Sequence, residues 1–206
     1  MNTRPDAILF DLDGVLIDSE GLYTGFWEKT EALYPTGIPN FARAIKGTNL
    51  DSIMQLFKPE ERDDIMARIL DFDSHLEYPM FDGTLDLLDR LAALNIPAAL
   101  VTSSNPEKMD QLSRQYPDFL ARFATVINGS MVSRGKPDPE GYLLAATKLG
   151  KKPADCVVVE DSLQGIRAGR AAGCEVWALT TTLPAATVTP EAHHTFPTLL
   201  ALLSAL

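Results

Sequence analysis

Two aspartates, Asp11 and Asp13, stand two residues apart directly after the apolar run Ala7–Phe10. If the backbone stays extended past Phe10, residues at this spacing point to the same side, so the two carboxylates share one space. Like charges that close raise each other's pKa unless a cation relieves the repulsion. The stretch FDLDG therefore indicates either an ordinary turn, in which Asp and Gly are common, or a site that holds a cation.

Polar residues occupy three comparable places further along the chain. They are Thr102, Ser103, Ser104 and Asn105 after the apolar run PAALV, Lys136 in the segment RGKPDPEGY, and Glu160 and Asp161 after the run CVVV. Each group alone also fits a structural role, because such side chains cap helices and loop lysines are common. In an open parallel sheet, however, ligands bind beyond the carboxyl ends of the strands. The coincidence of four such groups therefore favours one shared site.

An oxygen-rich metal site is one chemistry that this set predicts. Asp11, Asp13 and Asp161 would supply carboxylates, with Glu160 next to them. Mg²⁺ prefers oxygen ligands and commonly keeps several of its waters. Such an ion relieves the repulsion between the carboxylates and neutralises the oxygens of a bound phosphate. We therefore expect Mg²⁺ as the cofactor.

The remaining polar groups suit a phosphoryl group. The Thr102 hydroxyl can donate to a phosphoryl oxygen, and donors in the residues that follow, Ser103 and Asn105 among them, add to it. Lys136 adds a point charge that suits a phosphate. The set predicts phosphoryl transfer in which one carboxylate is the nucleophile. Asp13 is then the general acid and base, a role worth roughly 10²–10⁴ in rate.

This chemistry requires elements that bring the polar groups together. Short apolar runs without polar alternation are typical of strands buried on both faces of a parallel sheet. The sequence predicts strands at Ala7–Phe10, Ala98–Val101, Thr125–Ile127, Cys156–Val159 and Val176–Leu179, and helices at Thr84–Leu94, Glu107–Gln115, Pro139–Leu149, Ser162–Ala172 and Thr198–Leu206. This alternation predicts an α/β fold, a doubly wound parallel Rossmann-like sheet with right-handed crossovers.

One long stretch interrupts the alternation. Between Asp18 and Met80 the apolar residues follow a helical spacing, and no strand pattern occurs. We therefore predict that residues 18–79 form an inserted α-helical bundle, while residues 1–17 and 80–206 form the α/β core domain. An insertion joined to a core by two linkers suits a mobile lid.

The composition limits the partners and the compartment. The 206 residues carry a formal net charge of −10 at pH 7, which argues against a general nucleic-acid or anionic-membrane surface. No apolar run approaches the ~20 residues of a membrane span, and the first residues form no apolar signal region. Cys156 and Cys174, the only cysteines, each adjoin an apolar run, which favours buried thiols and a cytoplasmic location. His193 and His194 are adjacent and would diverge in a strand, so we expect no metal site there.

Four segments together carry a resemblance to a known family. FDLDGVLIDSE, LVTSSN, RGKPDPEGY and VVVEDSLQGIRAGRAAG match, in this order, the motifs of the haloacid dehalogenase (HAD) superfamily of hydrolases. In particular the chain resembles the β-phosphoglucomutase-like phosphatases, in which a helical cap follows the first motif. The resemblance covers both core segments, and the inserted bundle corresponds to the cap.

The resemblance implies a role for each motif residue. Asp11 would be the nucleophile that forms an aspartyl-phosphate, and Asp13 would be the acid and base. The other implied roles are phosphoryl binding by Thr102 and Lys136, and magnesium binding by Asp11, the Asp13 carbonyl and Asp161 with Glu160 assisting. The partner that we expect is a small phosphorylated metabolite, a sugar phosphate among the options. Nucleic acid and membrane are not expected, and the enzyme would be a monomer or a weak homo-oligomer.

Related activities differ in residues that can be read from the sequence. Dehalogenases of the superfamily lack the second aspartate of the first motif, so Asp13 argues against that chemistry. Phosphomutases share the core motifs, but Leu50 stands where we would align the arginine that holds their second phosphate. We therefore expect a phosphatase. The alternatives are a β-phosphoglucomutase-like phosphomutase and a non-catalytic binding protein with this fold. Substrate-contacting cap residues are expected near Gly47–Asp51 and Tyr23–Trp27.

Overall fold

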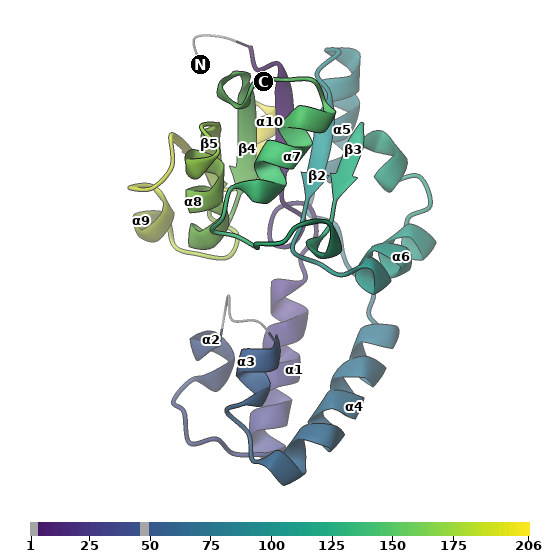
Figure 1. Ribbon diagram of the computed structural model, residues 1–206, viewed down its shortest axis with the longest axis vertical. Helices are drawn as coiled ribbons and strands as arrows, with labels where there is room; N and C mark the ends of the chain where they lie inside the picture. The colour runs from purple at the N-terminus through teal and green to yellow at the C-terminus, as the bar shows by residue number, and fades with distance from the viewer. Residues whose placement is uncertain (1–3, 46–49) are drawn as a thin grey trace. The chain divides into compact units, whose positions relative to one another are not determined.

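The chain is organised as two compact units (Figure 1). The structure is a computed structural model that describes residues 4–45 and 50–206. The core unit comprises Met1–Asp18 and Pro79–Leu206, and the inserted unit comprises Ser19–Tyr78. The two ends of the core unit that lead to the insertion pair with each other, because Asp18 N donates to Pro79 O at 2.8 Å.

A six-stranded parallel sheet forms the centre of the core unit. Its strands are β1 (Ala7–Phe10), β2 (Ala98–Val101), β3 (Thr125–Ile127), β4 (Cys156–Glu160), β5 (Glu175–Leu179) and β6 (His194–Phe196), in the order β3-β2-β1-β4-β5-β6. Every neighbouring pair is parallel, which confirms the predicted doubly wound α/β fold. The five predicted strands are present, and β4 and β5 are each one residue longer than predicted. The sequence does not predict β6, because its three residues, HTF, contain no apolar run.

The register of the sheet brings three strand ends together. Phe10, the last residue of β1, pairs with Leu100 of β2 and with Val159 of β4. β1 therefore lies between the two strands that lead to Thr102 and to Glu160, and all four of its residues are fully buried. Because the strands are parallel, the polar residues that follow them emerge at one edge of the sheet.

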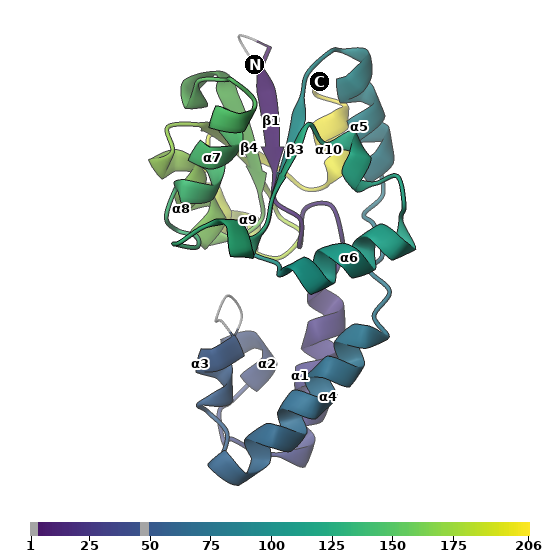
Figure 2. The same cartoon turned by 45° about the vertical axis from the view of Figure 1, so that its right-hand side comes forward.

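Helices cover both faces of the sheet. They are α5 (Thr84–Ala93), α6 (Pro106–Gln115), α7 (Glu140–Lys148), α8 (Leu163–Ala171), α9 (Ala185–Val188) and α10 (Leu199–Leu203), with 3₁₀ turns η2 (Leu120–Arg122), η3 (Gly129–Met131) and η4 (Pro153–Asp155). Figure 2 shows α7 and α8 on one face, and α5 and α10 on the other. The predicted helices agree at each end within one residue, except that the last helix ends at Leu203. Within the described residues, no helix combines the length and the apolar character that a membrane span requires.

Apolar packing attaches the loops of the sheet edge to rigid elements. Leu9, Val101 and Val158 of the strands share one buried cluster with Tyr142 of α7 and Ile166 of α8. Burial of apolar surface contributes roughly 25 cal/mol per Å², so these side chains hold the two helices firmly against the sheet. Residues that follow the strands or begin these helices are therefore held in defined positions.

The described part of the inserted unit contains helices and no strand. It contains α1 (Glu20–Leu33), α2 (Phe41–Ala44), α3 (Leu50–Met54), η1 (Pro59–Glu61) and α4 (Arg62–Ser74). Trp27, Phe41 and Phe57 form an aromatic core, with ring centroids 5.2 to 6.3 Å apart. Trp27, one of the residues expected near the substrate, is thus packed inside this unit. Gly47, Thr48 and Asn49, which belong to the other segment expected to contact substrate, lie outside the described residues.

The two cysteines and the histidine pair have structural roles in the core unit. Cys156 and Cys174 are buried free thiols, as predicted. His193 Nδ1 accepts a hydrogen bond from Val176 N at 2.9 Å, whereas His194 Nε2 lies 3.2 Å from a carboxylate oxygen of Glu175. The two rings therefore serve different partners at the edge of the sheet and do not converge on a common point.

Candidate active site

The loop after β1 forms a tight turn that carries Asp11 and Asp13. Gly14 N donates to Ile17 O at 2.9 Å, which closes the turn. Gly14 has a φ of +75°, and a Cβ atom there would lie 1.9 Å from Asp161 Oδ2. The turn is therefore part of the site, because it brings the backbone at Gly14 directly against a carboxylate from another strand end.

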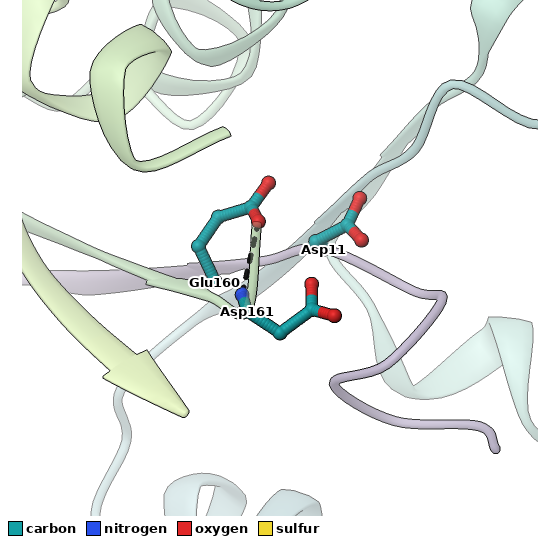
Figure 3. A group of neighbouring side chains, drawn as sticks. All are labelled: Asp11, Glu160 and Asp161. Atoms are coloured by element: carbon teal, nitrogen blue, oxygen red, sulfur yellow. Dashed lines mark hydrogen bonds between the residues drawn. The ribbon is translucent and has the colours of Figure 1, made fainter. Parts of the chain in front are cut away.

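Three acidic side chains lie together at the carboxyl edge of the sheet. Asp11, Glu160 and Asp161 have carboxylate oxygens within 4.8 Å of one another (Figure 3). The three residues are only 8%, 0% and 3% exposed. Burying carboxylates is costly unless cations or hydrogen-bond donors compensate for the lost water. The cluster therefore requires positive charge nearby.

Lys136 supplies one positive charge to this cluster. Its ammonium donates to Asp11 Oδ1 at 2.5 Å, to Glu160 Oε1 at 2.7 Å and to Val101 O at 3.1 Å. Burial by itself would lower the pKa of Lys136, but the carboxylates of Asp11 and Glu160 raise it well above its ordinary value. Lys136 is therefore a charged member of the site and not an ordinary loop lysine.

Five donors hold the Glu160 carboxylate. Oε1 accepts from Lys136 Nζ and, at 2.9 Å, from the Tyr142 hydroxyl. Oε2 accepts from the backbone N–H groups of Asp161 and Ser162 and from the Ser162 hydroxyl, at 3.0 to 3.1 Å. Burial would raise the pKa of Glu160, but Lys136 and these hydrogen bonds outweigh burial and lower the pKa. Glu160 is thus an ionised group with a fixed orientation.

In contrast to Glu160, Asp11 and Asp161 have raised pKa values. Burial, together with the charges of Glu160 and Asp13, raises the pKa of Asp11 to about 7 in spite of Lys136. Burial and the charges of Glu160 and Asp11 raise the pKa of Asp161 well above its ordinary value. The cluster has three buried carboxylates and one lysine, which contacts two of them, so negative charge exceeds positive charge there.

The loop after β2 presents polar groups at the same edge. Thr102 is 4% exposed, and its Oγ1 accepts from Ser104 N at 3.0 Å, which leaves the hydroxyl proton for another acceptor. Asn105 Oδ1 accepts from Lys108 N at 2.9 Å, so this side chain caps α6, as the capping alternative predicts. Ser103 is exposed.

Asp13 has its own set of partners. The Ser104 hydroxyl donates to Asp13 Oδ2 at 2.9 Å, and the Lys108 ammonium, from α6, donates to Asp13 Oδ1. The two aspartates of the first motif therefore contact two different lysines, Lys136 for Asp11 and Lys108 for Asp13.

The carboxylate cluster contains three of the four residues predicted to bind the metal, Asp11, Glu160 and Asp161. The carboxylate of the fourth, Asp13, pairs with Lys108 instead. The reason is that the chain bends from Leu12 onward, so the extended alternation that would place Asp13 beside Asp11 does not continue. A role for Asp13 in metal binding through its backbone carbonyl stays a prediction.

Comparison with known proteins identifies the family. The haloacid dehalogenase-like hydrolase family matches residues 5–173. The chain belongs to this family of hydrolases. It is 32% identical over 186 residues to hexitol phosphatase A of Escherichia coli (strain K12), which covers 85% of this chain and 83% of the relative. The predicted HAD membership is thereby confirmed, and the protein is an enzyme of the hydrolase class.

Two further similarities concern the fold and the length of the HAD chain. It resembles the crystal structure of a HAD family hydrolase from Deinococcus radiodurans R1 with bound phosphate and sodium, with a TM-score of 0.81 and 28% identity over 97% of this chain and 94% of that chain. It is also 28% identical over 194 residues to the bifunctional riboflavin kinase/FMN phosphatase of Arabidopsis thaliana, a match that covers 84% of this chain. The chain spans about half of that longer relative, 48% of its length.

HAD enzymes generally use Mg²⁺, and the residues of this chain fit that ion. Asp11 and Asp161 provide buried carboxylates whose raised pKa values reflect the excess of negative charge. The buried Thr182 hydroxyl borders Gly14 on the side of Asp161, and its hydrogen bond to Asp161 opposes the rise in the pKa of that carboxyl group. An all-oxygen donor set with excess negative charge is the kind of site that Mg²⁺ prefers.

Two residues of the HAD site were not found by sequence reasoning. Tyr142 lies on α7, six residues after Lys136, and Lys108 lies in the first turn of α6. Both occur in helical patterns that are also typical of core or surface positions, so their residue types alone indicate no chemistry. A signal for Lys108 does exist, because side chains in the first turn of a helix lean towards its N-terminus and hence towards the strand end before it.

Proposed function

We propose that this protein is a magnesium-dependent phosphatase that hydrolyses a small phosphorylated metabolite through an aspartyl-phosphate intermediate. The observation that carries the proposal is the buried cluster of Asp11, Glu160 and Asp161 with Lys136, at the point where β1 and β4 end. A site that combines buried carboxylates with a charged lysine suits a dianionic phosphoryl group once a cation is bound.

In the first step Asp11 acts as the nucleophile. One of its carboxylate oxygens forms a bond to phosphorus, and the bond between phosphorus and the oxygen of the leaving group breaks. Asp13 gives its proton to that oxygen, so the alcohol leaves as a neutral molecule. Asp11 is then a mixed anhydride with phosphate.

In the second step the same two residues hydrolyse the intermediate. Asp13, now ionised, takes a proton from a water molecule, and the water oxygen attacks phosphorus. The bond between phosphorus and the Asp11 oxygen breaks, which releases inorganic phosphate and regenerates both carboxyl groups. In both steps the Thr102 hydroxyl donates to an oxygen of the phosphoryl group, and the positive charge of Lys136 stabilises the negative charge on that group.

Asp11 and Asp161 would hold Mg²⁺, together with the Asp13 carbonyl. Bound there, the ion neutralises charge on the phosphoryl oxygens and on the carboxylates. Glu160 would assist without binding the ion directly, because its carboxylate already accepts hydrogen bonds from Lys136 and from four further donors.

The substrate that we propose is a phosphorylated sugar or sugar alcohol. This assignment is supported by hexitol phosphatase A of Escherichia coli (strain K12), a relative with 32% identity. We further propose that residues 18–79 act as a lid domain. An insertion joined to the core by two linkers can close over the site, which excludes water and selects the substrate.

Metal removal provides a direct prediction. Phosphate release from sorbitol 6-phosphate, glucose 6-phosphate and phenyl phosphate is measured with Mg²⁺, with excess EDTA, and after Mg²⁺ is restored. We expect EDTA to reduce turnover by at least about 100-fold and Mg²⁺ to restore it, because the charge excess in the cluster is then compensated. Full turnover in EDTA would exclude the metal, and no phosphate release from any substrate of the panel would exclude the phosphatase.

A second assay separates hydrolysis from isomerisation. β-Glucose 1-phosphate is supplied with a glucose 1,6-bisphosphate primer, and glucose 6-phosphate is measured beside inorganic phosphate. We expect phosphate release to be the faster process. If glucose 6-phosphate formed faster than phosphate, the protein would be a phosphomutase and the proposal would be wrong.

A further inference from the structure

The contact between Lys108 and Asp13 joins two elements that are 95 positions apart in the chain. Asp13 belongs to the loop after β1, and Lys108 belongs to α6, which follows β2. The Lys108 side chain is 12% exposed and the Asp13 side chain 30%. An ammonium that has lost most of its water is stable only beside an anion, so this ion pair is part of the folded architecture.

α6 holds the backbone of Lys108 in a defined place. The helix is capped by the Asn105 side chain, which accepts from the Lys108 N–H itself, and Pro106 begins it. Met109 and Leu112 anchor the helix, since they are 5% and 0% exposed. Lys108 therefore reaches Asp13 from a rigid element, whereas Asp13 lies on a loop.

Both oxygens of the Asp13 carboxylate accept hydrogen bonds from the segment that follows β2. Lys108 donates to Oδ1, and the hydroxyl of Ser104 donates to Oδ2 at 2.9 Å. Two donors on two oxygens fix the plane of a carboxylate as well as its position. The orientation of Asp13 is thus determined by the segment after β2 and not by its own loop alone.

We propose that Lys108 is a positioning residue for the acid and base of this enzyme, with Ser104 as its partner. This inference rests on the proposed function, in which Asp13 moves the proton in both steps. Proton transfer is efficient only within hydrogen-bond reach of the reacting oxygen, and a misplacement of about 1 Å can reduce the rate about 100-fold. Lys108 acts through Asp13, whereas Lys136 contacts Asp11.

A double-mutant cycle tests this directly, with phenyl phosphate as the probe because its leaving group needs a proton. Lys108→Gln is compared with the parent enzyme, and Lys108→Gln with Asp13→Asn is compared with Asp13→Asn alone, in single-turnover phosphate release. We expect Lys108→Gln to lower the rate constant at saturating substrate about tenfold in the parent. In the Asp13→Asn background, where there is no carboxylate to position, we expect less than a twofold effect.

Conservative and matched variants complete the design. Lys108→Arg keeps the charge and should recover at least about a third of the parent rate. Lys151→Gln removes another lysine–aspartate pair of the core unit, Lys151 Nζ to Asp6 Oδ2 at 3.2 Å, ahead of β1, and should leave the rate unchanged. Thermal unfolding of all variants shows whether Lys108→Gln remains folded at the assay temperature.

Two results would overturn the inference. An equal loss in both backgrounds would mean that Lys108 acts on the substrate or elsewhere and not through Asp13. An unchanged rate in Lys108→Gln would mean that Asp13 needs no such support. Neither result affects the proposed function, which fails in the same experiment only if Asp13→Asn itself retains the parent rate.

Discussion

Replacing Asp11 by Asn is expected to reduce phosphate release by about 10⁴-fold or more, since the amide cannot attack phosphorus. Asn has the shape of Asp, and its carbonyl oxygen can still accept the hydrogen bond that Lys136 donates to Asp11 Oδ1. The fold should therefore survive. The substitution also removes one of three buried negative charges, and this relieves repulsion within the cluster.

The measurement for Asp11→Asn combines activity with stability. Single-turnover phosphate release from phenyl phosphate reports the chemical step, and urea unfolding reports the fold. Asp6→Asn is the matched control, because Asp6 lies just before the other end of β1 and its side chain is 56% exposed. Turnover of Asp11→Asn within tenfold of the parent would contradict the assignment of Asp11 as nucleophile.

Replacing Gly165 by Ala is expected to displace the Glu160 carboxylate and so to disturb the site. Gly165 lies in the first turn of α8, and a Cβ atom there would lie 1.6 Å from Glu160 Oε1 and 1.9 Å from Glu160 Cδ. The Glu160 carboxylate cannot move aside without losing its hydrogen bonds to Lys136 and Tyr142. Breaking a buried ion pair in this way costs about 3–5 kcal/mol.

We expect Gly165→Ala to lower the free energy of unfolding by about 3 kcal/mol. Activity should fall by at least about 100-fold, because Lys136 loses the partner that orients it towards Asp11. Urea unfolding and phosphate release measure the two effects. Gly25→Ala is the matched control, since Gly25 also lies in a helix, α1, and a Cβ there meets nothing within 4 Å.

The control Gly25→Ala should itself change the stability slightly. Alanine is favoured over glycine inside a helix by about 1 kcal/mol, so Gly25→Ala should raise the stability slightly and leave activity unchanged. If Gly165→Ala were as stable and as active as Gly25→Ala, the close contact between α8 and Glu160 would not exist in the folded protein.

The strands could be predicted from sequence because burial leaves a simple trace. β1 and β2 are covered on both faces, so each reads as an unbroken apolar run. β6 escaped prediction because it is a short strand at the edge of the sheet, with His194 exposed and the other two residues half-buried. Helix ends were predictable within one residue where a capping residue or a proline marks them, as Asn105 and Pro106 do for α6.

Several alternatives were decided only by the packed structure. The stretch Thr102–Asn105 proved to contain both a helix cap, Asn105, and groups that face the site. In the segment after β4, Ser162 caps α8 by accepting from Gly165 N at 3.1 Å, which leaves Glu160 for Lys136. Capping and chemistry thus occur side by side, because a helix that starts at a strand end needs both a cap and a position at the edge.

The sequence by itself determined which chemistry is available. It placed two aspartates, a loop with hydroxyl side chains, a lysine and an acidic pair after predicted strands. These local signals depend only on neighbouring residues. The tertiary structure decided the partners. Lys136 takes Asp11, 125 positions away, and Lys108 takes Asp13, 95 positions away. Lys108 reaches Asp13 because β1 lies beside β2, and Lys136 reaches Asp11 from the segment between β3 and α7, a helix that packs on β1 and β2. No local pattern encodes which distant charge will lie within reach.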